Sequence, residues 1–183
     1  MKRVVSVVFV AMLVGLGVGC ADKEAQTALA EMRAQAELEA RNIEVIKTVI
    51  AELDKGNADA FQKFYAPDAK YYFPSNSPTP MSRDDEVAMF KMMKAAIPDL
   101  THQVTDIFAA QDRVIMRSVV RGTHKAELEG IPASGSPIGV GTICIFRLKD
   151  GLVVEEIQDA DMLGFYQQLG MELKPKAPAN QAR

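Results

Sequence analysis

The chain has few of the residues on which disulfide-bonded and zinc-binding proteins depend. Its 183 residues include two cysteines, two histidines and no tryptophan. The cysteines Cys20 and Cys144 cannot form a disulfide framework, and a zinc site with several Cys and His ligands is excluded. The sequence also contains no glycine-rich phosphate loop and no serine-nucleophile motif. We therefore expect neither a metal nor another cofactor.

An excess of charge of either sign is also absent. The chain has 21 Lys and Arg residues against 24 Asp and Glu residues, a net charge of −3. Domains that bind nucleic acid usually carry a basic excess, so we expect no nucleic-acid partner. Hydrophobic residues make up 48% of the chain and charged residues 25%, which is typical of a globular protein and not of a disordered one.

The first nineteen residues have the pattern of a signal peptide. Lys2 and Arg3 precede an apolar run over residues 4–19 that only Ser6 interrupts. This run is shorter than the roughly 20 residues that a helix needs to cross a bilayer. The pattern favours a secretory signal peptide, with an uncleaved N-terminal anchor as the alternative.

The end of this segment, Val18-Gly19-Cys20, resembles the cleavage site of a bacterial lipoprotein. In such proteins the cysteine is acylated and becomes the new N-terminus, and two or more acyl chains anchor a protein stably. Gly17 departs from the pattern, which more usually has Leu at that position, and ordinary signal-peptidase cleavage is the competing interpretation. The resemblance implies lipidation at Cys20 and a place in the bacterial cell envelope, anchored to the membrane and facing the periplasm or the exterior.

Composition divides the rest of the chain into three parts. Residues 20–41 are rich in Ala, Glu, Gln and Arg and contain neither Gly nor Pro, so they predict a lipidated helical tether. Residues 42–173 predict one folded domain. Residues 174–183, KPKAPANQAR, predict a disordered tail.

Hydrophobic periodicity within the domain predicts helices first and strands later. Apolar residues recur at helical spacing from Ile43 to Leu53, and Ser82 with Asp85 has the spacing of a capping box before another helix. The predicted helices are 42–55, 59–65, 83–97 and 162–169, and the predicted strands are 70–73, 101–109, 113–125, 138–149 and 152–159. This order indicates an α+β fold whose helices cover one face of a curved, mostly antiparallel sheet, with a pocket between them.

Three stretches resemble one known family. They are FYAPD at 64–68, the segment 112–135 with DRVIMR, RGTH and GIPASG, and the segment 150–170 with DG, EE, DMLG and QLG. In this order they resemble the SnoaL-like polyketide and ester cyclases, over about residues 42–173. That family has the nuclear transport factor 2-like fold, a cone-shaped α+β domain that often dimerises through its sheet. The resemblance therefore implies the same cone and leaves a homodimer open.

The resemblance also implies two catalytic residues. By position, Asp161 is the general acid/base and His124 assists it, whereas a helix N-cap is the structural alternative for Asp161. Arg117 is a third candidate, because its strand looks buried on both faces and a buried arginine needs an anionic partner. Strand alternation places Arg117 and His124 on opposite faces, unless Gly122 forms a β-bulge. The family usually has Trp where this chain has Ile157.

Two functions are compatible with these observations. The first is an envelope-anchored domain that binds a small apolar carbonyl compound and catalyses cofactor-free cyclisation of the aldol or ester cyclase type, as a lyase or isomerase. The second is a lipoprotein that binds a small hydrophobic ligand without turnover, because one fold hosts many functions. An epoxide hydrolase or isomerase is a third, and it needs more convergent acids than the sequence identifies.

Overall fold

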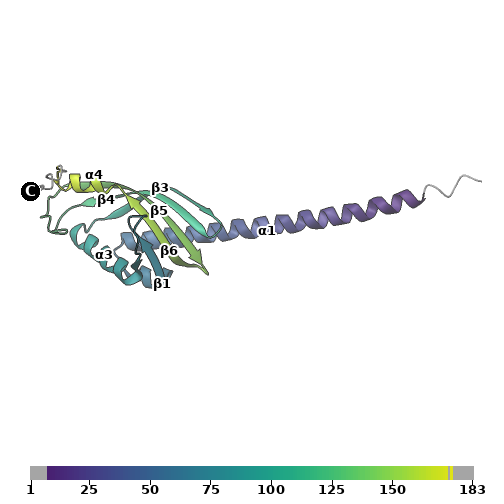
Figure 1. The fold of residues 1–183 in the computed structure, drawn as a ribbon, viewed down its shortest axis with the longest axis horizontal. Helices are drawn as coiled ribbons and strands as arrows, with labels where there is room; N and C mark the ends of the chain where they lie inside the picture. Colours follow the sequence, from purple (N-terminus) through teal and green to yellow (C-terminus); the bar gives the residue numbers. More distant parts are fainter. Residues whose placement is uncertain (1–7, 173, 175–183) are drawn as a thin grey trace, which may run out of the picture.

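The chain forms a long helix that leads into a curved sheet (Figure 1). The structure is a computed structural model that describes residues 8–172 and residue 174, with side chains described from residue 22 onward. The tail predicted to be disordered lies outside the described residues, apart from Lys174. The helices are α1 (Val8–Asp54), α2 (Asp59–Phe64), α3 (Arg83–Ala96) and α4 (Met162–Gln168). The strands are β1 (Tyr65–Tyr72), β2 (Met81–Ser82), β3 (Thr101–Ala110), β4 (Arg113–Thr123), β5 (Pro137–Lys149) and β6 (Leu152–Ala160).

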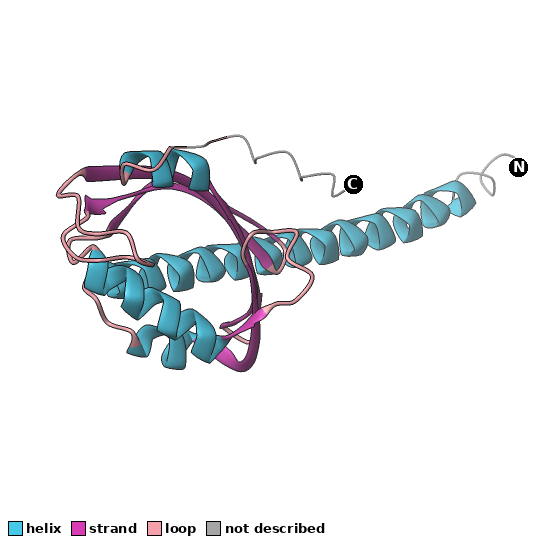
Figure 2. Ribbon diagram, turned by 60° about the vertical axis from the view of Figure 1, so that its left-hand side comes forward, coloured by secondary structure: helices cyan, strands magenta, loops and turns pink. Residues whose placement is uncertain are grey.

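All six strands belong to one sheet, in the order β2-β1-β6-β5-β4-β3. Neighbouring strands run antiparallel except β1 and β6, which are parallel. The sheet curves around the domain half of α1 and around α3 (Figure 2). The predicted α+β class with a curved sheet is confirmed, and the parallel pair makes the sheet mixed.

The helix α1 is continuous across the predicted boundary between tether and domain. Its residues 22–41 are mostly exposed, and this part of the helix projects away from the sheet (Figure 1). From Asn42 onward one face is buried, and Ile46 and Val49 have no exposed surface. Cys20 lies within α1 at a position whose side chain is outside the described residues. Within the described range, no helix combines the length and hydropathy needed to span a membrane.

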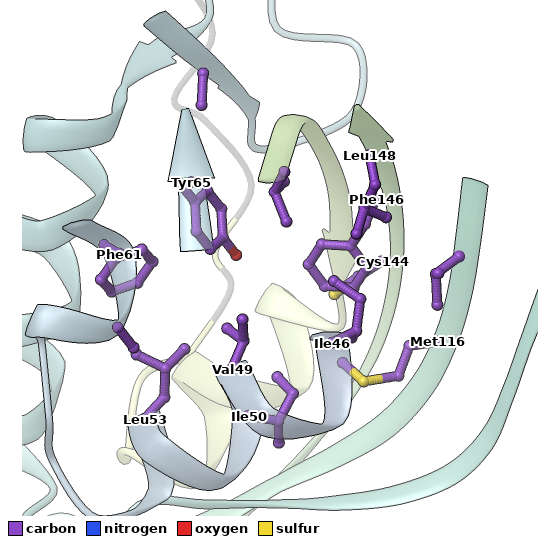
Figure 3. Close-up of a cluster of buried hydrophobic side chains, with 14 of the residues drawn as sticks. Ile46, Val49, Ile50, Leu53, Phe61, Tyr65, Met116, Cys144, Phe146 and Leu148 are labelled. Carbon is purple, nitrogen blue, oxygen red and sulfur yellow. The ribbon is translucent and has the colours of Figure 1, made fainter. Parts of the chain in front are cut away.

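Two hydrophobic clusters occupy the two ends of the space inside the sheet. The first gathers residues of α1, α2 and the central strands, among them Val49, Phe61 and Phe146 (Figure 3). Cys144 is buried in this cluster, so its thiol is part of the core. The second gathers Leu128 and Phe165 with the end of α3 and the start of β5.

The local signals read from the sequence are largely confirmed. The Ser82 side chain accepts from the Asp85 N–H, and the Asp85 side chain accepts from the Ser82 N–H, which completes the capping box of α3. The main difference is at β1, which starts at Tyr65 although strand structure was expected only from residue 70. Its pairing with β6 shifts register between Tyr65 and Lys70, where Pro67 has no N–H to donate.

Gly122 does not form the bulge that would have been needed to bring Arg117 and His124 to one face. The pairing of β4 with β5 is uninterrupted from Arg113 to Thr123. Gly122 instead lets β4 pass close to the end of α3, because a Cβ there would overlap the Ile97 side chain and lie 3.2 Å from the Leu100 Cα. Bulges occur elsewhere, in β3 between Val104 and Asp106 and in the β5–β6 pair.

Candidate active site

A cavity of about 230 Å³ lies between the concave face of the sheet and helices α1 to α4. Most of its lining side chains are aliphatic, aromatic or methionine, supplied by both hydrophobic clusters. A mostly apolar cavity with a few polar groups is the usual form of a small-molecule site. The polar or ionisable lining residues, apart from Cys144, are Tyr65, Tyr71, Glu86, Glu129, His102, Thr142, Glu156, Gln158 and Tyr166.

Two of these residues form a buried pair of carboxyl groups. Glu86 comes from the first turn of α3 and Glu156 from the middle of β6, and each is only 6% exposed. The two carboxyl groups are within hydrogen-bonding reach of each other. The Tyr65 hydroxyl donates to Glu156 Oε2 over 2.7 Å. Figure 3 shows the Tyr65 ring as part of the first cluster, with its oxygen turned toward the side of Cys144 and Phe146.

Burial makes both carboxyl groups hold protons more tightly than usual. It raises the pKa of Glu156 to about 7, against the opposing effect of the hydrogen bonds from Tyr65 and Glu86. Burial, followed by the nearby charge of Glu156, raises the pKa of Glu86 well above its ordinary value. The pair therefore holds a proton near neutral pH, with protonated Glu86 donating to the Glu156 carboxylate.

A histidine held by an aspartate faces the same cavity. Asp54, the last residue of α1, accepts from the His102 N–H over 3.0 Å, and its Oδ1 lies 2.7 Å from His102 Nδ1. This contact places the ring proton on Nδ1, between the two groups, and leaves Nε2 free to accept or donate a proton. Among the described residues, the side-chain hydrogen bond of the His102 ring is the one from Nδ1 to Asp54. His102 also lies close enough to lower the pKa of Glu156.

A third polar contact orients an amide group. The Tyr71 hydroxyl donates to Gln158 Oε1 over 2.7 Å, and both residues line the cavity. With its oxygen engaged by Tyr71, the Gln158 amide directs its NH₂ group elsewhere and can donate to a ligand oxygen. Burial raises the pKa of Tyr71, so its hydroxyl stays protonated.

The structure does not bring the three sequence-predicted residues to this cavity. Asp161 is the N-cap of α4, and its Oδ1 accepts from the Gly164 N–H over 2.8 Å. Arg117 lies on the outer face of the sheet, paired with Asp106 at 2.6 Å, and its side chain is 62% exposed. The expectation that Arg117 is buried is therefore wrong, because only one face of β4 is covered.

His124 lies on the inner face but outside the cavity. It is fully buried, and its Nδ1 accepts from the Ser134 N–H over 3.2 Å. Its Nε2 has no partner among the described residues. Strand alternation correctly placed His124 and Arg117 on opposite faces of β4. Asp161, His124 and Arg117 are all absent from the side chains that line the cavity.

A β-bulge explains why sequence reasoning missed Glu156. Val153 points inward, so strict alternation would turn Glu155 inward and Glu156 outward. The register shift between Arg147 and Leu148 reverses this order, so Glu155 pairs with Arg147 outside and Glu156 enters the cavity. The feature of the sequence that could have identified Glu156 was the Glu155-Glu156 pair, which was part of the family resemblance.

The remaining site residues carried weaker signals. Glu86 follows Asp84 and Asp85 in the first turn of α3, where acidic residues complement the helix dipole, so it does not stand out in the sequence as a site residue. Ile157, which replaces the family's Trp, pairs with Ile145 and does not line the cavity. Within the described ranges, no three His, Cys, Asp or Glu side chains are arranged to hold a metal ion.

Comparison with known proteins agrees with this architecture. The family model described as SnoaL-like polyketide cyclase matches residues 43–169. No curated protein matches the chain.

Solved structures give the same fold. IdmH from Streptomyces antibioticus, assigned as a polyketide cyclase, is 28% identical, with a TM-score of 0.63 over 71% of this chain and 99% of its own. AclR from Streptomyces galilaeus, assigned as a hydroxylase, is 26% identical, with a TM-score of 0.67 over 72% and 97%. A SnoaL-like protein from a Jannaschia species is 22% identical, with a TM-score of 0.66 over 74% and 96%, and shows the fold alone.

Proposed function

Because the chain belongs to the SnoaL-like polyketide cyclase family, we propose that its cavity binds a small apolar carbonyl compound and catalyses cofactor-free cyclisation of it. The observation that carries this proposal is the coupled Glu86–Glu156 pair inside a mostly apolar cavity. A carboxylate with a pKa near neutrality is suited to proton transfer at neutral pH.

Each of the two carboxyl groups has a separate task in this reaction. The Glu156 carboxylate removes the proton from the carbon next to a carbonyl, and the electron pair of that C–H bond forms an enolate. Protonated Glu86 and the Gln158 amide donate to the enolate oxygen. The enolate carbon then attacks a second carbonyl of the same molecule, which forms the ring bond. The resulting alkoxide takes the proton back from Glu156, so the pair returns to its starting state.

Exchange of α-protons isolates the first step of this reaction. The protein should accelerate hydrogen–deuterium exchange of 2-tetralone in D₂O, followed by ¹H NMR. Glu156→Gln should lower the exchange rate by about 100-fold, which is within the usual contribution of general acid–base catalysis. Asp161→Asn serves as the matched carboxylate variant outside the cavity and should keep the wild-type rate. Unchanged exchange in Glu156→Gln would contradict the proposal, and loss in Asp161→Asn alone would favour the residue implied by the family resemblance.

A non-catalytic binding role is the second candidate. The observation in its favour is that Asp161 and His124, which the resemblance implied, do not line the cavity. A protein of this kind would capture a small hydrophobic molecule in the envelope without changing it. Native mass spectrometry of the purified protein, together with the exchange assay, distinguishes the two functions. A retained ligand in a protein that catalyses no exchange favours binding alone.

We further propose that Cys20 is lipidated and that the exposed part of α1 separates the domain from the membrane of the cell envelope. A helix rises 1.5 Å per residue, so residues 20–41 span roughly 30 Å. When the gene is expressed in a bacterium that processes lipoproteins, radiolabelled palmitate should enter the wild type and the Cys144→Ser variant. Cys20→Ser should take up no label and should leave the membrane fraction. Label retained by Cys20→Ser would contradict the anchor.

A further inference from the structure

The charges around the cavity are all of one sign. Glu86, Glu129 and Glu156 line it, and His102 is the one other ionisable side chain there besides its tyrosines and Cys144. No Lys or Arg is among the lining side chains in the part of the chain that the structure describes. A carboxylate ligand would meet like charges and lose its hydration without a compensating cation. The cavity therefore disfavours anions.

Glu129 occupies an unusual backbone position at the edge of this cavity. It forms a two-residue turn with Gly130, and both have positive φ, at 50° and 82°. The turn is closed by hydrogen bonds between Leu128 and Ile131 in both directions, at 3.0 and 2.8 Å. A residue other than glycine in this region costs on the order of 1 kcal/mol, and such strain is concentrated at functional sites. Asn, Asp or Gly would fit the turn better, so turn formation does not explain a glutamate.

The Glu129 carboxylate is held in place from the other side of the cavity mouth. The Tyr166 hydroxyl, from α4, donates to Glu129 Oε2 over 3.0 Å, and this contact raises the pKa of Tyr166. Glu129 Oε1 accepts no hydrogen bond from the described residues. Glu129 itself is exposed, whereas Leu128 beside it is buried in the second hydrophobic cluster. A fixed carboxylate with a free oxygen therefore borders both solvent and the apolar interior.

We propose that Glu129 recognises an ammonium group on a ligand whose apolar body fills the cavity. This deepens the proposed function, on whose cavity it rests: the substrate is an apolar carbonyl compound that carries an amine. The apolar body lies between the two clusters with its reacting carbon at Glu156, and the ammonium group stays at the mouth. There it keeps part of its hydration while it pairs with Glu129, which costs less than burial inside.

Three probes with one ring system and different charges test this recognition. They are 1-naphthylmethylamine, 1-naphthalenemethanol and 1-naphthoate, titrated by naphthalene fluorescence, which no tryptophan obscures in this chain. The wild type should bind the amine about tenfold more tightly than the alcohol and should bind the acid most weakly. The preference for the amine should shrink as salt rises from about 20 to about 500 mM, because salt screens charges near the surface.

Two glutamine variants test whether the preference for the amine over the alcohol depends on Glu129. Glu129→Gln should bind the amine and the alcohol equally. Glu127→Gln makes the same charge change two residues away, at an exposed side chain outside the cavity, and should keep the tenfold preference. The proposal is overturned if the wild type shows no preference for the amine, if Glu129→Gln retains it, or if Glu127→Gln loses it equally.

The binding titrations are independent of the exchange assay. If Glu156→Gln abolishes exchange while the amine binds no better than the alcohol, amine recognition is wrong and the catalytic proposal stands. If the amine preference depends on Glu129 while no exchange occurs, Glu129 recognises the amine, and the protein binds its ligand without catalysis.

Discussion

Glu156 shows how a single side chain can acquire a chemical role from its surroundings. On an exposed strand, Glu156 would have the ordinary pKa of a glutamate. It would then not differ from the other acidic residues, of which the chain has 24 in all. Facing inward beside Glu86 and Tyr65, it is only 6% exposed and has a pKa of about 7. Desolvation penalises the charged form most, and the hydrogen bonds from Tyr65 and Glu86 offset part of that penalty.

This raised pKa makes the stability of the fold depend on pH. In the unfolded chain the Glu156 carboxyl ionises near its ordinary value of 4.5, whereas in the folded protein it ionises near 7. The folded state therefore binds more protons in this window, and the free energy of unfolding falls as pH rises from about 4.5 to about 7. One pKa unit corresponds to about 1.4 kcal/mol, so the rise of the Glu156 pKa from 4.5 to about 7 contributes about 3 kcal/mol over this window.

The double variant Glu86→Gln/Glu156→Gln removes both groups and should lack this dependence. Its free energy of unfolding, measured in urea across the pH series, should gain about 3 kcal/mol on the wild type between pH 4.5 and 7.5. A difference between the two proteins that stays constant over that range would show that the pair does not titrate as described.

Some close contacts between elements of the fold cannot be predicted from the local sequence. Gly122 was considered only as a possible bulge, and its strand is regular, with its missing side chain making room for Ile97 and Leu100. At this point the connection from α3 to β3 crosses β4. The position therefore depends on packing between elements and not on the conformation of β4 itself.

Gly122→Ala should destabilise the protein by about 1 to 3 kcal/mol, the usual cost of overpacking a core. Gly141→Ala is the matched control on β5, where an added Cβ would meet no atom within 4 Å. It should leave the free energy of unfolding unchanged or slightly higher, because a strand glycine is less favourable than alanine. Equal losses in the two variants would contradict the close contact at Gly122.

At the scale of the whole molecule, α1 connects an exposed segment to the core. The last contacts on its exposed side involve Gln111, whose φ is 58° in the turn between β3 and β4. Its N–H donates to Glu39 Oε1 over 2.8 Å, and Gln35 in turn donates to Glu39. From residue 22 onward, where side chains are described, Asn42 is the first buried residue of α1. The domain therefore depends on α1 from about Gln35 onward.

Two truncations test this boundary. A protein that lacks residues 1–33 keeps Gln35 and Glu39 and should unfold within about 3 °C of the full chain. A protein that lacks residues 1–43 loses the Glu39 contact and the buried Asn42. It should unfold at least about 5 °C lower, because one lost kcal/mol shifts the melting temperature by a few degrees in a domain of this size. Circular dichroism on heating measures both, and equal melting temperatures would place the boundary later.

Local properties of the sequence determined most of the elements and their order. Helical spacing of apolar residues from Ile43 to Leu53 located the domain half of α1, and the Ser82–Asp85 capping box marked the start of α3. These features depend on residues close together in the chain, so they can be read from it. Family resemblance then supplied the fold, but it implied catalytic residues that do not share a cavity.

Only the tertiary structure decided which side chains face that cavity. Asp161 has both a catalytic and a capping interpretation in the sequence, and its hydrogen bond to Gly164 shows the cap. Glu86, His102 and Glu156 come from α3, β3 and β6, far apart in sequence, and a bulge in the β5–β6 pair turns Glu156 inward. Register and burial depend on pairing between distant segments, which alternation along one strand cannot specify.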